Sequence, residues 1–105
     1  MIYKLSVHER LLLLGILPQE GDLTTIRLVR ELREDLSFTE EEHTALEFQY
    51  QDNSIHWKDD VAKDKEIDIG PRAADVVRSA LQELDKGGKL REVHLPLVDM
   101  FEYEG

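Results

Sequence analysis

The apolar residues of this chain change their spacing after Leu46, and this change constrains the fold more than any other feature. Up to Leu46 they recur every three or four residues, as on one face of an α-helix. In the run 47–51, large apolar and polar residues alternate, as they do along a β-strand. Helical spacing returns after Pro71. The sequence therefore predicts a mainly helical α+β protein with helices on both sides of a short β-region.

Capping signals mark the starts of three helices before the β-region. In a capping box, a Ser or Thr side chain accepts a backbone N–H three residues on, and a Glu there reaches back to the cap. The candidate caps are Ser6 with Glu9, then Asp22 or Thr24, and finally Ser37 with Glu40 or Thr39 with Glu42. Pro18 and Gly21 end the first helix. Three helices are therefore expected over the first 46 residues.

Two further helices are predicted after the β-region. Pro71 suits a first helical turn, and Gly87-Gly88 ends the apolar stripe that follows it. A second, shorter helix is entered at Pro96. The complete expectation is five helices in one globular domain spanning residues 1–105, a length typical of single domains.

The β-region has the pattern of a hairpin. Asp52-Asn53 is a plausible two-residue turn, because both residues tolerate a left-handed backbone. This register places Tyr50 opposite Ile55 and Phe48 opposite Trp57, on one face that is expected to be buried. The run Glu66–Ile69 is a candidate third strand, added to the hairpin.

The order of three helices and a hairpin resembles that of winged-helix domains. In such domains the third helix reads DNA, but here it begins with "TEEEH". The whole chain has a formal charge of −10, which repels phosphate backbones and anionic lipid heads. We therefore expect no direct nucleic-acid binding and no membrane association. If the arrangement is winged, it is expected to serve protein contacts.

Residue types exclude several kinds of chemistry. The chain has no cysteine, which removes disulfides, thiol nucleophiles and cysteine-ligated metals and fits a reducing cytoplasm. Its N-terminal apolar run is interrupted by charged residues and lacks the cleavage pattern of a secretion signal. No nucleophile elbow, HExxH motif or phosphate-binding loop occurs. The sequence predicts a cytoplasmic, non-catalytic protein without a cofactor.

One metal-binding alternative stays open. Glu40 and His43 have the Glu-x-x-His spacing of carboxylate-bridged metal sites, and Glu47 lies one turn further along. That chemistry requires a second such pair, and the chain has none. Glutamates in a first helical turn are also favoured by the cap and the helix dipole. The leading expectation is that these residues hold no metal.

The order of several segments resembles that in a group of small uncharacterised bacteriophage and prophage proteins. The segments are "ERLLLLGILPQEG", "LVRELREDLSFTEEEH", "IHW", "EIDIG" and "ALQELDKGGKL", which together extend over nearly the whole chain. The resemblance implies a viral context, and with it action in the host cytoplasm. It implies no activity and assigns no functional residue.

The C-terminal segment is the predicted interaction surface. It crowds five large apolar residues into seven positions, more than one face of a short helix can bury: Leu97, Val98, Met100, Phe101 and Tyr103. The leading functional hypothesis is a protein-binding or assembly protein that acts through protein–protein contacts, with a homodimer as one form. An alternative is an acidic nucleic-acid mimic that inhibits a host protein by occupying a basic cleft.

Overall fold

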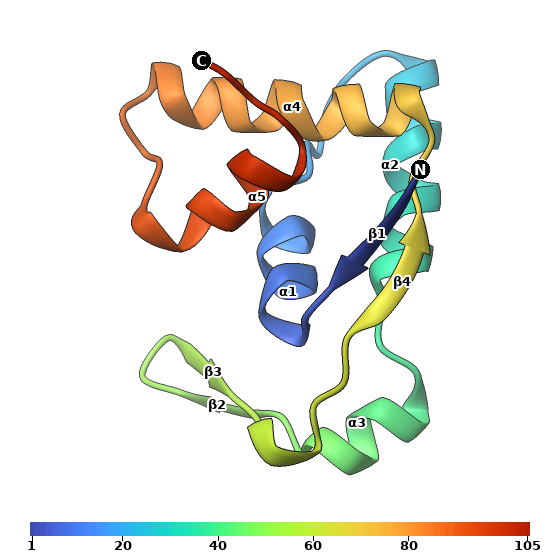
Figure 1. Cartoon of the computed structure of the whole chain (residues 1–105), viewed down its shortest axis with the longest axis vertical. Coiled ribbons are helices and arrows are strands. Elements are labelled where there is room, and N and C mark those ends of the chain that lie inside the picture. Colours follow the sequence, from blue (N-terminus) through green and yellow to red (C-terminus); the bar gives the residue numbers. More distant parts are fainter.

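A computed structural model describes residues 1–105 as a mainly helical α+β structure with two small antiparallel sheets (Figure 1). The predicted fold class is confirmed. The elements in chain order are β1 (Ile2–Leu5), α1 (Val7–Ile16), α2 (Leu23–Leu36), α3 (Glu40–Leu46), β2 (Gln49–Gln51), β3 (Ser54–His56), the 3-10 turn η1 (Asp59–Val61), β4 (Lys65–Asp68), α4 (Pro71–Lys86), the 3-10 turn η2 (Glu92–His94) and α5 (Leu95–Met100).

The helix starts follow the predicted capping residues. Ser6 forms a capping box with Glu9 at the start of α1, and Asp22 caps α2. Of the two capping pairs considered for α3, Thr39 with Glu42 forms the box. The Ser37 hydroxyl instead donates back to a carbonyl in the last turn of α2. Ser37 therefore ends the second helix rather than beginning the third.

The strand β4 pairs with β1 and not with the hairpin, so the predicted three-stranded sheet is wrong. In the antiparallel pair, Tyr3 lies opposite Ile67 and Leu5 opposite Lys65. Tyr3, Leu5 and Ile67 are buried, whereas the alternate residues face solvent. Pairing with β1 places Ile67 in the core, which is the physical reason for this choice of partner. The strand β1 itself was not expected from the sequence.

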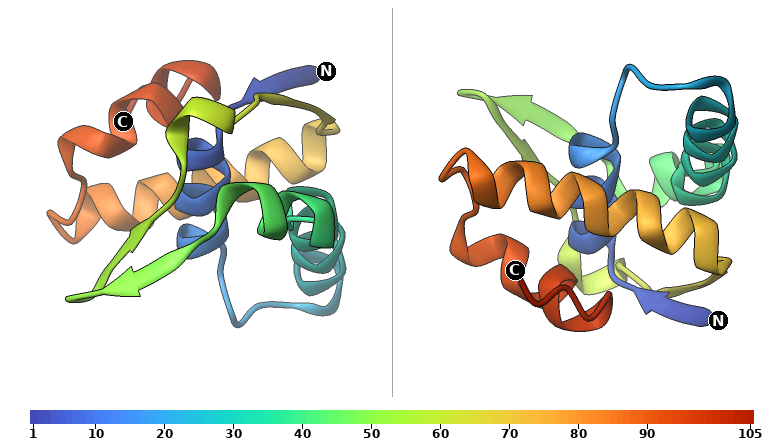
Figure 2. Two further views of the ribbon diagram at one scale, coloured as in Figure 1. Left: turned by 90° about the horizontal axis from the view of Figure 1, so that it is seen from below. Right: turned by 90° about the horizontal axis from the view of Figure 1, so that it is seen from above.

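One cluster of 15 buried residues forms the core between the β1–β4 sheet and helices α1, α2, α4 and α5. Figure 2 shows α4 crossing α1, with α2 beside them. Each of these elements supplies fully buried side chains, among them Leu5, Leu13, Leu36, Val77, Leu81, Leu97 and Phe101. No helix is both long enough and apolar enough to span a membrane.

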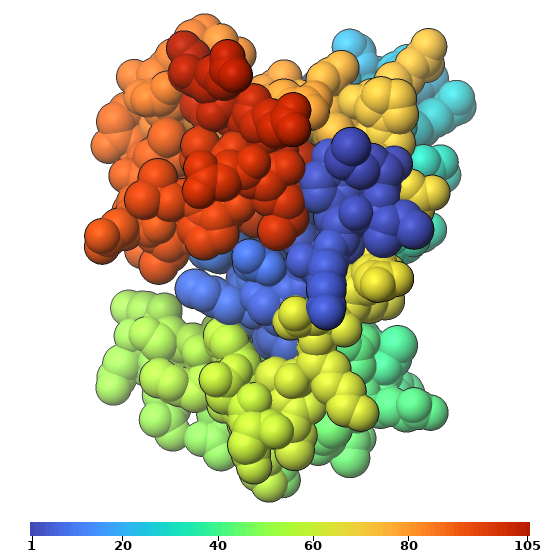
Figure 3. All heavy atoms as spheres, viewed as in Figure 1, coloured from blue at the N-terminus to red at the C-terminus, as the bar shows by residue number.

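Residues 39–64, comprising α3, β2, β3 and η1, form a separate part of the molecule that we call the hairpin lobe. It lies at the end of the molecule away from α4, and its hairpin extends to one side (Figure 1). The surface is hollowed between this hairpin and the C-terminal segment, with α1 behind (Figure 3). The hairpin lobe contributes none of the residues of the main core.

Candidate functional site

The predicted C-terminal surface is divided between the core and the exterior. Leu97 and Phe101 are fully buried, and the Phe101 ring stacks on Tyr3 at 4.6 Å between centroids. Val98, Met100 and Tyr103 are half-buried and pack against the same core. Only these last three can contact a partner while the chain remains folded. Self-association through them stays a prediction.

Two hydrogen bonds attach the C-terminal segment to α4. Arg78 donates from Nε to the Phe101 carbonyl at 2.6 Å, and the Tyr103 hydroxyl donates to Asp85 Oδ2 at 2.7 Å. The hydrogen bond to Asp85 raises the pKa of Tyr103, because it favours the protonated phenol. The chain therefore folds this segment back onto itself and satisfies most of its apolar surface internally.

The residues considered for a metal are turned to other partners. His43 lies against two aromatic rings, with its centroid 5.4 Å from that of Phe48. Glu47 forms an ion pair with Lys58 at 2.6 Å, while Glu40 is exposed on the first turn of α3. No three His, Asp or Glu side chains are grouped as metal ligands. His43 thus packs against aromatic rings, Glu47 is paired with Lys58, and Glu40 is one of the acidic residues in the first turn of α3.

Arg10, which sequence reasoning did not single out, is fully buried on the inner face of α1. Its guanidinium donates to two carbonyls at the end of α2, those of Leu36 at 3.1 Å and Ser37 at 2.7 Å. It also donates to both carboxylate oxygens of Glu42, at 2.5 and 3.2 Å. The guanidinium carbon lies 4.0 Å from the centre of the Phe38 ring. One side chain thereby fixes the α2–α3 connection against α1.

The ion pair with Arg10 makes Glu42 an acid-sensitive group. The hydrogen bond from Arg10 lowers the pKa of Glu42 from 4.5 to about 2. Because the folded-state pKa is the lower one, this stabilisation is complete above about pH 4.5 and is lost as the pH falls towards 2. We expect a contribution of about 2 kcal/mol, below the full linkage value because Glu42 keeps some solvent contact.

Urea unfolding between pH 7 and pH 2.5 measures this contribution. The reference is the double variant Arg10→Met with Glu42→Gln, which removes the charge pair but keeps side chains of similar size. The difference in unfolding free energy between the wild type and the double variant should change only below about pH 4.5. A difference that stays constant over the whole range would contradict the assignment.

Aromatic side chains extend from Arg10 to the base of the hairpin. Phe38 meets Phe48 edge to face at 5.0 Å between centroids, and Phe48 lies 6.3 Å from Trp57. Trp57 in turn lies 6.0 Å from His8 on α1. Phe48 and Trp57 are half-buried by these contacts. The base of the hairpin is therefore fixed to the body of the protein.

The outer part of the hairpin is exposed, although the sequence predicted a buried face there. The register is as predicted, with Tyr50 opposite Ile55, and the turn residues Asp52 and Asn53 have φ angles of 49° and 64°. However, Tyr50 is 74% exposed and Ile55 is 37% exposed. The face is thus half-buried at Phe48 and Trp57 and open beyond them. The reason is that the hairpin projects past the helices that would have covered it (Figure 1).

Negative charge is concentrated in the same part of the molecule. The hairpin lobe contains eight Asp and Glu residues and two Lys residues, so a quarter of the chain holds −6 of the formal charge of −10. Its two ion pairs are Glu42 with Arg10 and Glu47 with Lys58. The exposed pair Tyr50 and Ile55 is therefore an apolar patch in an acidic surface.

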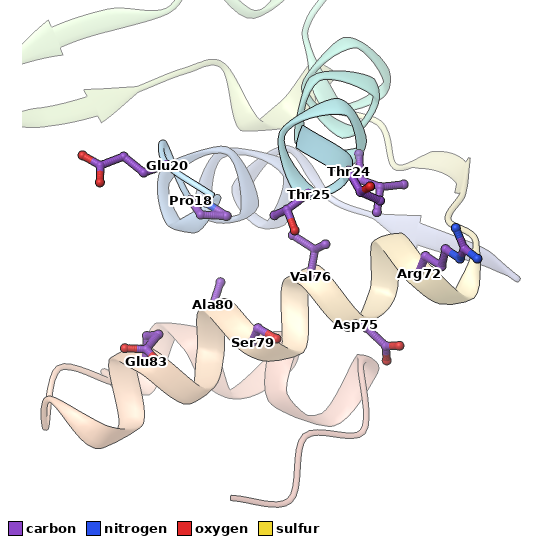
Figure 4. A pocket seen from close by; sticks show the side chains of 11 residues that line it. Pro18, Glu20, Thr24, Thr25, Arg72, Asp75, Val76, Ser79, Ala80 and Glu83 are labelled. Atoms are coloured by element: carbon purple, nitrogen blue, oxygen red, sulfur yellow. The ribbon is translucent and has the colours of Figure 1, made fainter. Parts of the chain in front are cut away.

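A second feature is an open groove of about 500 Å³ between α2 and α4 (Figure 4). Leu28, Val76 and Ala80 form its apolar part, and Pro18 from the α1–α2 connection closes one side. Hydroxyl groups and charged side chains surround this apolar part, with Glu20 at one end and Arg72 at the other (Figure 4). The groove has the character of a binding surface for an amphipathic ligand.

Three of the histidines lie in two different surroundings. His8 and His56 border a hollow of about 400 Å³ beside Trp57, whose buried indole N–H has no hydrogen-bond acceptor. His94 is buried, and its Nδ1 accepts the Arg91 N–H at 2.9 Å, while burial lowers the pKa of His94.

Comparisons of the chain with protein-family models, curated proteins and solved structures find no match.

Proposed function

We propose that this chain is a non-catalytic protein-binding or assembly protein that contacts a cationic partner protein through its hairpin. The observation that carries the proposal is the exposed pair Tyr50 and Ile55 within the acidic hairpin lobe. Interfaces commonly consist of an apolar centre with a polar rim, and Tyr is among the residues that contribute most to binding energy. The hairpin presents this composition on a projecting element.

The fixed base of the hairpin supports this role. Phe48 and Trp57 pack on the body through Phe38 and His8, so the base from which the tip projects is fixed before a partner arrives. A preorganised element loses less conformational freedom on binding. The surrounding carboxylates would accelerate encounter with a positively charged surface and would repel acidic proteins.

The segregation of charge favours a second candidate, an acidic nucleic-acid mimic. The segments "TEEEH", "KDD" and "KDKE" come together in or beside the hairpin lobe, whereas "FEYE" lies at the C-terminus. Such a surface would occupy a basic cleft that otherwise holds DNA or RNA. The resemblance to phage and prophage proteins supports a host protein as the target, in the bacterial cytoplasm. Competition with nucleic acid separates this candidate from the first.

The test is affinity capture from a bacterial lysate with mass spectrometry, using the wild type and the double variant Tyr50→Ser with Ile55→Ser. Partners bound through the hairpin should be rich in Lys and Arg. The double variant should capture at least about tenfold less of them, since truncation of a central anchor typically costs about 2 kcal/mol or more. Addition of salt should weaken capture as well.

The matched control is the double variant Leu23→Ser with Leu95→Ser, which removes exposed apolar side chains outside the hairpin lobe. It should capture the same partners as the wild type. Equal capture by the hairpin variant and the wild type would refute the proposal. Displacement of the partner by a DNA duplex would favour the mimic, and persistence of the complex would favour an ordinary protein contact.

A further inference from the structure

The walls of the α2–α4 groove are built from rows of residues four apart. On α4 these rows are Arg72, Val76 and Ala80, and beside them Asp75, Ser79 and Glu83. On α2, Thr24 and Leu28 have the same spacing. Rows with this spacing are the ridges by which one helix packs into the grooves of another. Because α2 runs across α4 rather than beside it (Figures 1 and 2), the surface has the form that accepts a third helix lying along α4 and over the first turns of α2.

Small side chains line the middle of the groove along α4, and larger side chains line its two ends. Ser79 and Ala80 are small, whereas Arg72 and Glu83 stand at opposite ends of the α4 wall (Figure 4). Small residues between larger ones leave space for an inserted side chain. The wall from residue 72 to residue 83 corresponds to about 16 Å, or about three turns of a docked helix.

The charges of the groove define its ligand further. Glu20 and Glu83 lie at the same end and form no ion pair (Figure 4). Arg72 lies at the other end and is also unpaired, whereas Asp75 is neutralised by Arg78 at 2.7 Å. A helix carries partial positive charge at its N-terminus and partial negative charge at its C-terminus. The charge pattern thus matches a helix that begins near Glu20 and Glu83 and ends near Arg72.

We propose that the α2–α4 groove binds an amphipathic helix of a partner protein, with basic residues near the N-terminus of that helix. Apolar residues at positions i, i+4 and i+7 of the docked helix would lie on the half-buried Leu28 and Ala80, above Val76, which is buried between them. A second copy of this chain is a poor occupant, because its long helices already bury their apolar faces and its charge is −10. This surface is separate from the hairpin, so either proposal can fail without the other.

The experiment is a selection from a displayed library of helical peptides. Apolar residues are fixed at positions i, i+4 and i+7 of the peptide, and all remaining positions may be Lys or Glu. We expect the selected peptides to be enriched in Lys in their first turn. In NMR titrations of the whole protein, they should shift the amide signals of Thr24, Val76, Ser79 and Ala80.

Three variants locate the site. Ser79→Tyr fills the groove from an exposed position, and Glu83→Lys reverses the charge at one end. Each should weaken binding of a selected peptide at least about tenfold, a difference of about 1.4 kcal/mol. The control Glu66→Lys makes the same charge change on the exposed face of β4 and should leave the affinity within about twofold.

Several results would overturn the proposal. The first is a selection that yields no binder, or one whose peptides are enriched in Glu in their first turn. The second is a set of amide shifts confined to the hairpin lobe. The third is equal affinity of the selected peptide for the wild type and for Ser79→Tyr. Binding of the selected peptide in an extended form, seen by nuclear Overhauser contacts, would also exclude a helical occupant.

Discussion

Replacing Glu42 with alanine is expected to lower the free energy of unfolding by about 3–4 kcal/mol, because it leaves the Arg10 guanidinium buried without its counter-ion. Arg10 is fully buried and keeps only two carbonyl acceptors and the Phe38 ring after the change. Removal of one partner of a buried pair is far more damaging than loss of a surface ion pair. Urea denaturation at pH 7 measures the effect.

Two controls separate the ion pair from the other roles of Glu42. Thr39→Ala removes the hydroxyl that accepts the Glu42 N–H but keeps the backbone N–H that donates to Glu42, and should cost about 1 kcal/mol. Glu41→Ala removes one carboxylate from the same helical turn without touching Arg10, and should cost less than about 0.5 kcal/mol. If Glu42→Ala costs no more than Thr39→Ala, the ion pair contributes nothing measurable.

Replacing Phe101 with alanine is expected to cost about 3–5 kcal/mol, as other truncations of buried aromatic residues do. The ring is fully buried and stacks on Tyr3, which belongs to the first strand. Its loss would therefore loosen the contact between the C-terminal segment and the β1–β4 sheet. Thermal and urea unfolding of the variant measure the change.

The neighbouring residue provides the control and tests self-association. Met100 is half-buried at the surface, so Met100→Ala should cost only about 1 kcal/mol. Sedimentation at several concentrations then asks whether Met100→Ala weakens a dimer while the protein stays folded. A Phe101→Ala variant with wild-type stability but an altered oligomeric state would place Phe101 in an interface instead of the core.

The parts of the fold that the sequence predicted best depend on local interactions. Capping at Ser6 and Asp22 and the turn at Asp52 are decided within a few residues, so their side-chain chemistry is visible in the sequence. The hairpin register is local in the same sense. These elements could be placed without knowledge of the tertiary structure.

The errors concern contacts between distant parts of the chain. Only four residues form β1, and its partner lies at least 60 positions away, so no local pattern indicated the pairing. The exposure of Tyr50 likewise depends on whether a helix covers the hairpin face. Alternation shows that two residues share a face, but it does not show what lies over that face.

Arg10 carried a signal that could have been recognised. It follows Val7 by three residues and precedes Leu13 and Leu17 on the buried side of α1. A charged residue within an apolar stripe implies a buried partner, because an unpaired charge is rarely buried. The sequence offered many carboxylates as that partner, and only the tertiary structure identifies Glu42.

The pairing of β1 with β4 has a consequence for how the protein is made. During synthesis the first strand leaves the ribosome long before residues 65–68 exist, and residues 6–64 separate the two strands. Closing so long a loop is entropically unfavourable until the intervening helices are compact. Formation of the sheet is therefore a late step in folding, and Tyr3 and Leu5 lack their partner strand until residues 65–68 have been made.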